Sequence, residues 1–415
     1  MNKRFAKAAL ASTVLLTGAA VFAADKPDSD DGATQDAQFA WKLFVQAMAP
    51  TSSGSLTFES WTEQCALQPQ MVGCPPPSAT AEKKGRTLHP SPLARRMAAK
   101  TGAKVSAITV NGVECNAMNT SGFTGFPAPK NLSGSAQFCE EVYVNPPEVQ
   151  FVQQNGLTTL SGQWTYANAH NAEVTFPTDA VEVKADWVPT SSFTSPNFQC
   201  PDPTNSLYTE TINGTCYALV GLHISSKAKP DWVWATFEPA SAVTNPNRCD
   251  PKLYDACFDP WGSTSKVPYG KDKAGTVKQS AQLQQLMSGA NLNKAFGNYY
   301  LTAVQTQFRD GRAKAIPLGN SFVEFNAQVP PHQASCITCH KYAYYDGVAP
   351  PAGQPEDNFG SAPPTGGWPN VGYACNKNQM QNCTPVVAKS ISQDFSWMLG
   401  LMPAGAAPSA PAEHK

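Results

Sequence analysis

One short motif in the sequence has residue types and a spacing that can bind a cofactor covalently. Cys336 and Cys339 lie three positions apart, and His340 directly follows the second cysteine. Two thiols at this spacing face the same side of a helical turn, so each can add to one vinyl group of a single haem, and the adjacent imidazole can bind the iron. We therefore predict one covalent haem c, attached through Cys336 and Cys339, with His340 as the proximal iron ligand.

Other interpretations of the motif have less support. In a chain of 415 residues with 12 cysteines and 6 histidines, this pattern would arise by chance about 0.005 times. A thioredoxin-like dithiol needs a strand that leads into the motif, whereas residues 330–333 are Pro-Pro-His-Gln. A plain disulfide between Cys336 and Cys339 is the remaining alternative, and it is uncommon at this spacing.

The five-residue motif resembles the attachment sequence of the c-type cytochromes. The chain is also similar to a group of large exported bacterial mono-haem proteins, in residues 182–187, 219–223 and 232–238. That resemblance implies export and a haem, but no particular reaction. Small electron carriers place the motif early in a compact helical domain, whereas here only 75 residues follow His340. Two arrangements therefore stay open: a compact cytochrome fold in those residues, or a haem seated against the preceding part of the chain.

The ligand on the distal side of the iron decides between electron transfer and chemistry at an open haem. Met398 and Met402 follow His340 at a cytochrome-like separation and are the first candidates. His223, in an apolar stretch, is a weaker candidate, since a lone histidine there is more often a hydrogen-bonded core residue. Met380 is a lesser alternative. We expect His332 to lie near the haem edge or in solvent. The remaining histidines should lie in polar loops or the tail, namely His89, His170 and His414.

These residues support electron transfer as the first functional hypothesis, with a low-spin haem that exchanges electrons with a periplasmic redox partner protein. The alternative is a haem-dependent oxidoreductase, peroxidase-like or oxygenase-like, with an open distal site and a small-molecule substrate. The size of the chain supports this alternative, because a simple electron-transfer protein does not need so many residues. A third hypothesis makes the preceding chain a docking module. The formal net charge of -1, without a basic stripe, argues against a nucleic-acid partner.

The first residues predict export to the periplasm. Lys3, Arg4 and Lys7 precede an apolar stretch, and small residues end it at Ala23, so residues 1–23 read as a cleaved signal peptide. No later apolar run is long enough to predict a membrane span. The ten cysteines outside the motif fall into close successive pairs, as expected in an oxidising compartment. Proximity alone suggests the pairs 65–74, 115–139, 200–216, 249–257 and 375–383.

The pattern of the remaining chain predicts an α+β fold, with a disulfide-stapled antiparallel β-rich body and a C-terminal haem segment. We expect a disordered leader at 24–34, a mainly β body with an N-terminal helix at 35–275, a helical and haem c segment at 276–402, and a disordered tail at 403–415. The 36 prolines and 29 glycines argue against a long-helix bundle.

Periodicity places individual elements within these regions. A helix is expected to end at Pro50, with Trp41 and Trp61 in one core. Residues 181–187 alternate as a half-buried strand with Glu182, Lys184 and Asp186 on its polar side, and 216–224 and 232–238 should form a hairpin. Further helices are expected after a capping box at Thr276 and Gln279, over 292–308 and over 392–401.

Overall fold

The computed structural model places the greater part of the chain. It describes residues 32–69, 74, 86, 88–91, 106–111, 113–120, 127–170, 174–195, 197–240, 257–264, 278–307, 318–327, 329, 334–341, 343–345, 373–374, 384–385 and 391–400. The predicted signal peptide, most of the leader, the tail, Met380, Met402, His332 and His414 lie outside these residues. So do Cys249, Cys375 and Cys383 of the last two predicted cysteine pairs.

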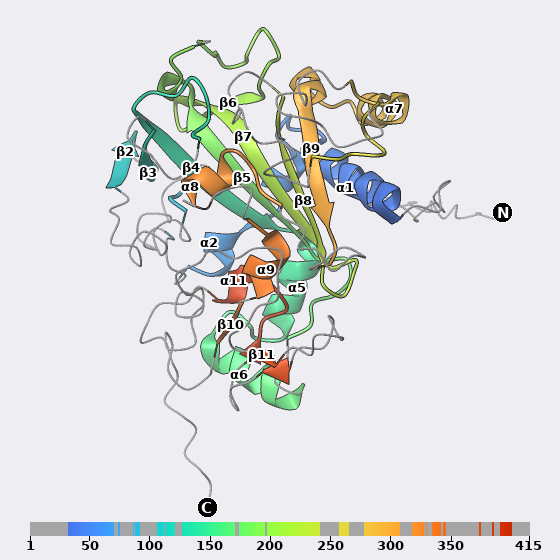
Figure 1. Cartoon of the computed structure of the whole chain (residues 1–415). Helices are drawn as coiled ribbons and strands as arrows, with labels where there is room; N and C mark the ends of the chain where they lie inside the picture. Colours follow the sequence, from blue (N-terminus) through green and yellow to red (C-terminus); the bar gives the residue numbers. More distant parts are fainter. Residues whose placement is uncertain are drawn as a thin grey trace, which may run out of the picture.

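An antiparallel sheet of nine strands forms the centre of the described structure, in the order β2-β3-β4-β5-β7-β8-β9, with β1 paired to β4 and β6 to β7 (Figure 1). Two small ladders, β10–β13 and β11–β12, complete the strand pairing. The strands are β1 (Thr62–Glu63), β2 (Ser106–Val110), β3 (Val113–Asn119), β4 (Ser135–Val144), β5 (Val181–Pro189), β6 (Thr209–Ile212), β7 (Thr215–Ser226), β8 (Val233–Pro239), β9 (Tyr299–Gln305), β10 (Tyr344–Tyr345), β11 (Tyr373–Ala374), β12 (Thr384–Pro385) and β13 (Ile391–Ser392).

Short helices surround this sheet, so the predicted α+β class is confirmed. They are α1 (Gly32–Met48), α2 (Gln64–Leu67), α5 (Pro146–Gln154), α6 (Leu160–Ala169), α7 (Ala281–Gly289), α8 (Val323–Asn326), α9 (Cys336–Lys341) and α11 (Trp397–Gly400), with 3-10 turns η1 (Thr57–Ser60), η2 (Thr190–Ser192) and η4 (Lys294–Asn298). Among the described residues no helix is both long and apolar enough to cross a membrane.

The longest helix, α1, covers one face of the sheet beside β8 and β9 (Figure 1). Its apolar residues recur at helical spacing, so one side of the helix is buried. Phe44 is fully buried, and its ring lies 4.6 Å from that of Phe237 on β8. Trp41 belongs to the same core, and Trp61 packs against it, as predicted. This core is largely apolar, although Glu141 of β4 is buried in it and accepts from Trp187 Nε1 at 2.8 Å. Its apolar burial stabilises the fold at about 25 cal/mol per Å².

The predicted hairpin is confirmed, because β7 pairs with β8 from Leu222–Phe237 to Ser226–Val233. The burial of the opposite face of the sheet differs from the prediction. The polar side of β5, however, is not exposed to solvent. Glu182 and Asp186 are 7% and 0% exposed, and the Lys184 side chain is 22% exposed. Tertiary packing buries both faces of β5, which a period-two pattern cannot anticipate.

The chain after β9 covers this second face. Figure 1 shows α9 and α11 together with α5 at one end of the sheet, and all three helices contribute to one buried cluster with Trp234 of β8. Helix α8 packs farther along the same face with Phe138 and Val220. The described part of the segment that carries Cys336, Cys339 and His340 is therefore seated against the sheet and does not form a separate helical unit.

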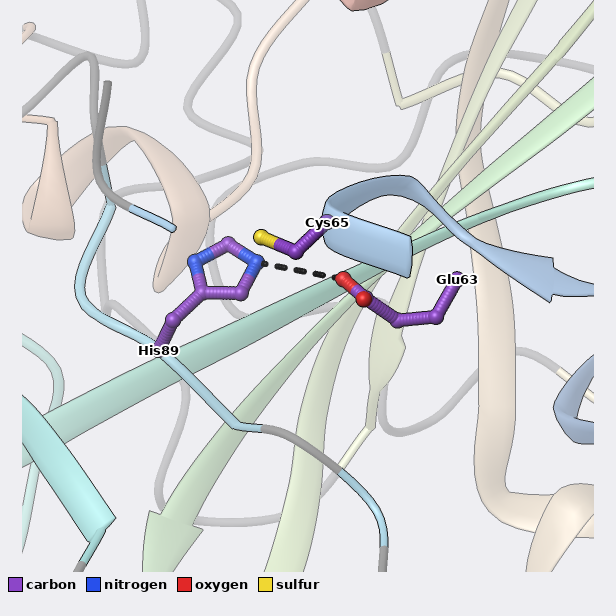
Figure 2. A group of neighbouring side chains, drawn as sticks. All are labelled: Glu63, Cys65 and His89. Carbon is purple, nitrogen blue, oxygen red and sulfur yellow. Dashed lines mark ion pairs between the residues drawn. The ribbon is translucent and has the colours of Figure 1, made fainter. Parts of the chain in front are cut away.

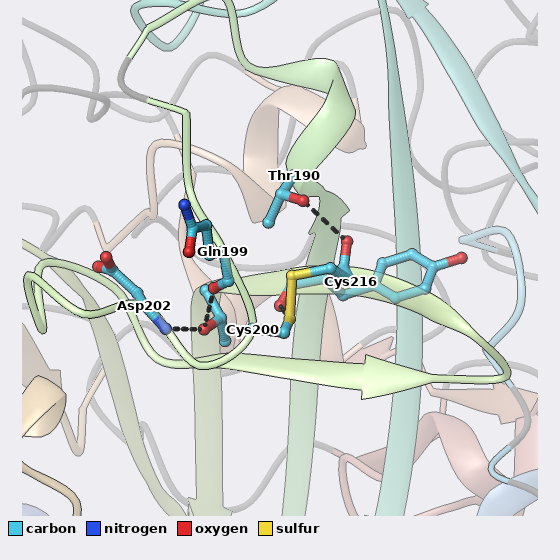
Figure 3. Close-up of a disulfide and its surroundings, with 7 residues drawn as sticks. Thr190, Gln199, Cys200, Asp202 and Cys216 are labelled. Carbon is cyan, nitrogen blue, oxygen red and sulfur yellow. Dashed lines mark hydrogen bonds between the residues drawn. A yellow bond between two sulfur atoms is a disulfide. The ribbon is translucent and has the colours of Figure 1, made fainter.

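Three of the predicted disulfides are present: Cys65–Cys74, Cys115–Cys139 and Cys200–Cys216. Cys257 is also disulfide-bonded, but its partner lies outside the described residues. Figure 3 shows how Cys200–Cys216 ties β7 to the loop before β6, where Thr190 donates to the Cys216 carbonyl at 3.3 Å. Nearby, Thr209 donates to the Gln199 carbonyl and accepts from the Asp202 amide, both at 2.7 Å.

Several predicted helices differ from the structure. Helix α7 begins at Ala281 with Ser280 as its N-cap, whose side chain accepts from the Leu283 amide, so the capping box at Thr276 and Gln279 is wrong. The helix expected over 292–308 is instead η4 followed by strand β9. Residues 299–305 are rich in aromatic and β-branched side chains, and β8 offers them a free edge to pair with.

The remaining differences lie elsewhere in the chain. The helix expected over 392–401 is confined to α11, after the short strand β13. Helices α5 and α6, which were not predicted, interrupt the region expected to be mainly β. Helix α1 begins at Gly32, within the expected leader.

Candidate functional site

Helix α9 carries the motif and is fixed to the sheet by the last residue of β9. The Gln305 side chain donates to Ser335 Oγ at 3.0 Å and accepts from the Ile337 amide at 2.9 Å. The Ser335 hydroxyl oxygen also accepts a hydrogen bond from the Thr338 amide at 3.4 Å. The Ser335 carbonyl accepts another from the Cys339 amide at 2.9 Å. Gln305 and Ser335 together therefore satisfy the amides of the first turn of a helix that is too short to be stable by itself.

Both motif cysteines are free thiols, in contrast to the disulfides elsewhere in the chain. Burial raises the pKa of Cys336 well above its ordinary value and that of Cys339 to about 12, and Glu324 raises both further. Reactive dithiols of the thioredoxin type depend on a lowered thiol pKa. These two thiols therefore lack the electrostatics of a disulfide-exchange pair, and they are not joined to each other.

His340 has the hydrogen bonding of a metal-binding imidazole. Its Nδ1 lies 2.8 Å from the carbonyl oxygen of Phe395. A carbonyl only accepts, so Nδ1 carries the hydrogen and the lone pair is left on Nε2. Burial lowers the His340 pKa to about 3, so the ring is neutral at physiological pH. A neutral imidazole whose other nitrogen donates to a carbonyl is the usual state of a metal ligand.

A cavity of about 100 Å³ lies between the sheet and the segment that carries the motif. Its sheet wall is formed by side chains from β4, β5, β7 and β8, namely Glu140, Val142, Glu182, Lys184, His223, Ile224, Ser225, Trp234 and Ala235. Its outer wall is formed by α2, α9 and α11, namely Gln64, Cys336, His340, Trp397 and Met398. The cavity thus brings together Cys336, His340, Met398 and His223, four of the residues that the sequence singled out.

The sheet wall contains charged groups that are largely removed from solvent. Lys184 Nζ lies 2.7 Å from Glu140. Burial alone would lower the Lys184 pKa, but the carboxyls of Glu140 and Asp186 outweigh it and raise that pKa. His223 Nε2 lies 3.6 Å from Glu324 of α8. Burial also raises the pKa of Asp186, whose two carboxyl oxygens have no hydrogen-bond partner among the described residues.

The segment 391–400 is held to the sheet side by three further contacts. Lys227 binds Asp394 at 2.6 Å, and Asp394 also accepts from the Phe176 amide at 2.8 Å. Ser396 donates to Glu182 at 2.6 Å. Because these contacts flank Phe395, they fix the carbonyl that binds His340. Sequence reasoning missed them, since the partners are more than 160 positions apart.

A second feature that sequence reasoning missed is a pair of buried acids behind the cavity. Glu148 on α5 is completely buried, neither of its carboxyl oxygens has a hydrogen-bond partner among the described residues, and the charge of Glu182 acts on it. Burial raises the pKa of both groups. Burial without a cation nearby in the described part of the chain thus favours the neutral form of Glu148.

Another cluster of potential metal ligands lies at the edge of the sheet. Glu63, Cys65 and His89 approach one another, and His89 Nε2 lies 3.9 Å from Glu63 (Figure 2). The Cys65 sulfur is already bound in the disulfide with Cys74, so it cannot be a thiolate ligand. His89 is 2% exposed, which corrects the expectation of an exposed loop residue, whereas His170 is exposed as predicted.

The residues at the cavity fit a covalent haem by the chemistry of their donor set. Two free thiols three positions apart on α9 precede a neutral imidazole whose Nδ1 is already occupied. The space is smaller than the roughly 300 Å³ or more of typical cofactor pockets. Seating a porphyrin therefore requires the two walls of the cavity to move apart.

Comparisons with known proteins add no further assignment: no family model, curated protein or solved structure matches this chain.

Proposed function

We propose that this protein is an exported mono-haem c-type cytochrome that acts in electron transfer, with haem c attached to Cys336 and Cys339 and His340 as the proximal ligand. The observation that carries the proposal is the state of His340. Its neutral ring donates from Nδ1 to the Phe395 carbonyl, directly beside two thiols that form no disulfide. A bound haem would supply a one-electron redox centre.

The protein's own residues would orient and shield that centre. The Phe395 carbonyl sets the tautomer and the rotation of the His340 ring. The Trp234 ring, 4.4 Å from the imidazole, packs against it from β8. Burial of the motif against the sheet keeps water away from the ligand and lowers the local dielectric, which are two of the means by which a protein sets a haem potential.

Export to the periplasm is part of the proposal. Its support is the signal-like start of the sequence together with the observed disulfides, which form and persist in oxidising compartments. The partner would then be another periplasmic redox protein.

A second candidate function is a haem-dependent oxidoreductase with an open distal site. The specific observation in its favour is the polar sheet wall, where Glu182, Lys184 and His223 line the cavity and could bind a small substrate or move protons. Rapid reaction of the ferric protein with peroxide, or binding of cyanide without displacement of a ligand, would favour this activity over a simple carrier.

The central proposal is tested by expressing the full chain in a host that exports and matures c-type cytochromes. We expect a haem stain at the mass of the protein after denaturing electrophoresis, and no stain for the double variant Cys336→Ala/Cys339→Ala. The matched control is His170→Ala, at an exposed histidine, which should retain the stain. Covalent haem in the double variant, or none in the wild-type protein, would refute the assignment.

A further inference from the structure

The two walls of the cavity differ in which iron ligands they offer. Axial ligands bind the two opposite faces of a planar haem, so the walls must be considered separately. The outer wall contains Cys336, which is one of the two proposed attachment cysteines, and His340, the proposed proximal ligand. It also contains Met398. The sheet wall contains one imidazole, that of His223. We propose that His223 binds the haem iron from the sheet side, opposite His340.

Met398 is poorly placed for this role because it belongs to the same short segment that supports His340. The Phe395 carbonyl binds Nδ1, the ring nitrogen directed away from the iron, so this part of the segment lies behind the proximal ligand. Met398 follows three residues later, and α11 begins at Trp397. A helical rise of about 1.5 Å per residue does not carry a side chain around the edge of a porphyrin to its other face.

The imidazole of His223 is largely enclosed on the sheet wall. Its side chain is 19% exposed, yet Nε2 is completely enclosed and has no hydrogen-bond partner among the described residues. A buried polar atom without a partner is costly, so such an atom needs a specific explanation. The imidazoles of His223 and His340 line the same cavity.

The other potential ligand on the sheet wall is already engaged. Lys184 lies opposite His223 in the β5–β7 register, but its ammonium group binds Glu140 at 2.7 Å. Glu140 and Asp186 both favour the charged ammonium, which has no lone pair for iron. His223 has only a 3.6 Å approach to Glu324, and a neutral imidazole can bind iron directly.

This inference rests on the proposed haem attachment and is tested on the haem-loaded full chain by absorption and electron paramagnetic resonance spectroscopy. We expect a low-spin ferric wild-type spectrum without a methionine–iron charge-transfer band. His223→Ala should become high-spin and bind cyanide, and added imidazole should restore the low-spin spectrum. Met398→Leu, a matched change in the opposite wall, should keep the wild-type spectrum.

A second variant guards against a folding defect at this strand. His223→Met should remain low-spin and gain the methionine–iron band, since only the ligand changes. A high-spin wild-type protein, or loss of the low-spin state in Met398→Leu together with its retention in His223→Ala, would overturn the inference. These outcomes leave the covalent haem stain intact, whereas absence of that stain in the wild-type protein overturns the proposed function itself.

Discussion

The two faces of the sheet are both buried, but their chemistry is different. On one face Val183, Ala185 and Trp187 of β5 join a largely apolar core beneath α1, in which Glu141 is paired with Arg86 beside Trp187. On the other face the same strand buries Glu182, Lys184 and Asp186 beneath α8, α9 and α11. Burying charge is expensive unless it is paired, and an apolar replacement is often more stable.

The comparison therefore indicates which face serves stability and which serves function. A fold needs only apolar packing of the first kind, whereas buried ionisable groups beside a cavity are typical of a binding or redox site. The cavity that contains His340 and His223 opens on the second face. Removing apolar packing from the first face should destabilise the fold, whereas replacing both members of a charge pair on the second face by apolar residues should not.

The largest expected effect is on the apolar face. Phe237→Ala removes a fully buried ring that packs 4.6 Å from Phe44 and 5.0 Å from Trp41. Loss of its burial and the cavity left behind should lower the free energy of unfolding by about 3–5 kcal/mol. Urea denaturation followed by tryptophan fluorescence measures this. The control Phe237→Leu should cost less than about half as much, and equal effects of the two variants would contradict the packing argument.

The pH dependence of stability tests a buried acid, Asp259, which lies beside Trp41 on the α1 side of the sheet. Asp259 accepts from Trp41 Nε1 at 2.7 Å, and burial raises its pKa to about 6. The folded state then holds a proton that the unfolded state releases above about pH 4, so this group makes stability fall as pH rises from about 4 to 6. The fall amounts to about 3 kcal/mol.

The variant Asp259→Asn keeps an oxygen for Trp41 and removes the titration. Urea denaturation at several values between pH 4 and pH 7 should therefore show a flatter profile than that of the wild-type protein. Parallel profiles for the two proteins would mean that Asp259 does not titrate in this range.

The smallest expected effect, and the sharpest test of the polar face, concerns the Lys184–Glu140 pair. Lys184→Met leaves Glu140 without its cation, at a cost of about 2 kcal/mol, below the 3–5 kcal/mol for fully buried pairs because Lys184 is 22% exposed. The double variant Lys184→Met/Glu140→Leu should recover that loss or exceed wild-type stability. Chemical denaturation of all four proteins in the cycle measures the coupling between the two residues. A double variant less stable than Lys184→Met would contradict the expectation that apolar residues can replace this pair without loss.

Much of the fold could be predicted because it depends on local patterns. Apolar spacing predicted α1, the β7–β8 hairpin follows from two strand-like runs separated by a polar turn, and three disulfides join cysteines that are near in sequence. The helix expected over 292–308 was wrong because the edge of β8 selected strand β9 there. Local propensity is a weak guide when a neighbouring strand can supply hydrogen bonds.

For the candidate site, the sequence by itself determined the motif: two thiols and an imidazole at a spacing that suits one haem are covalent facts of the chain. It also named Met398 and His223, but it did not show where they lie relative to His340. Only the tertiary structure decided that His340 donates to Phe395, that Met398 shares its wall and that His223 faces it from the sheet. These relations join residues from 55 to more than 100 positions apart, and packing rather than local spacing sets such distances.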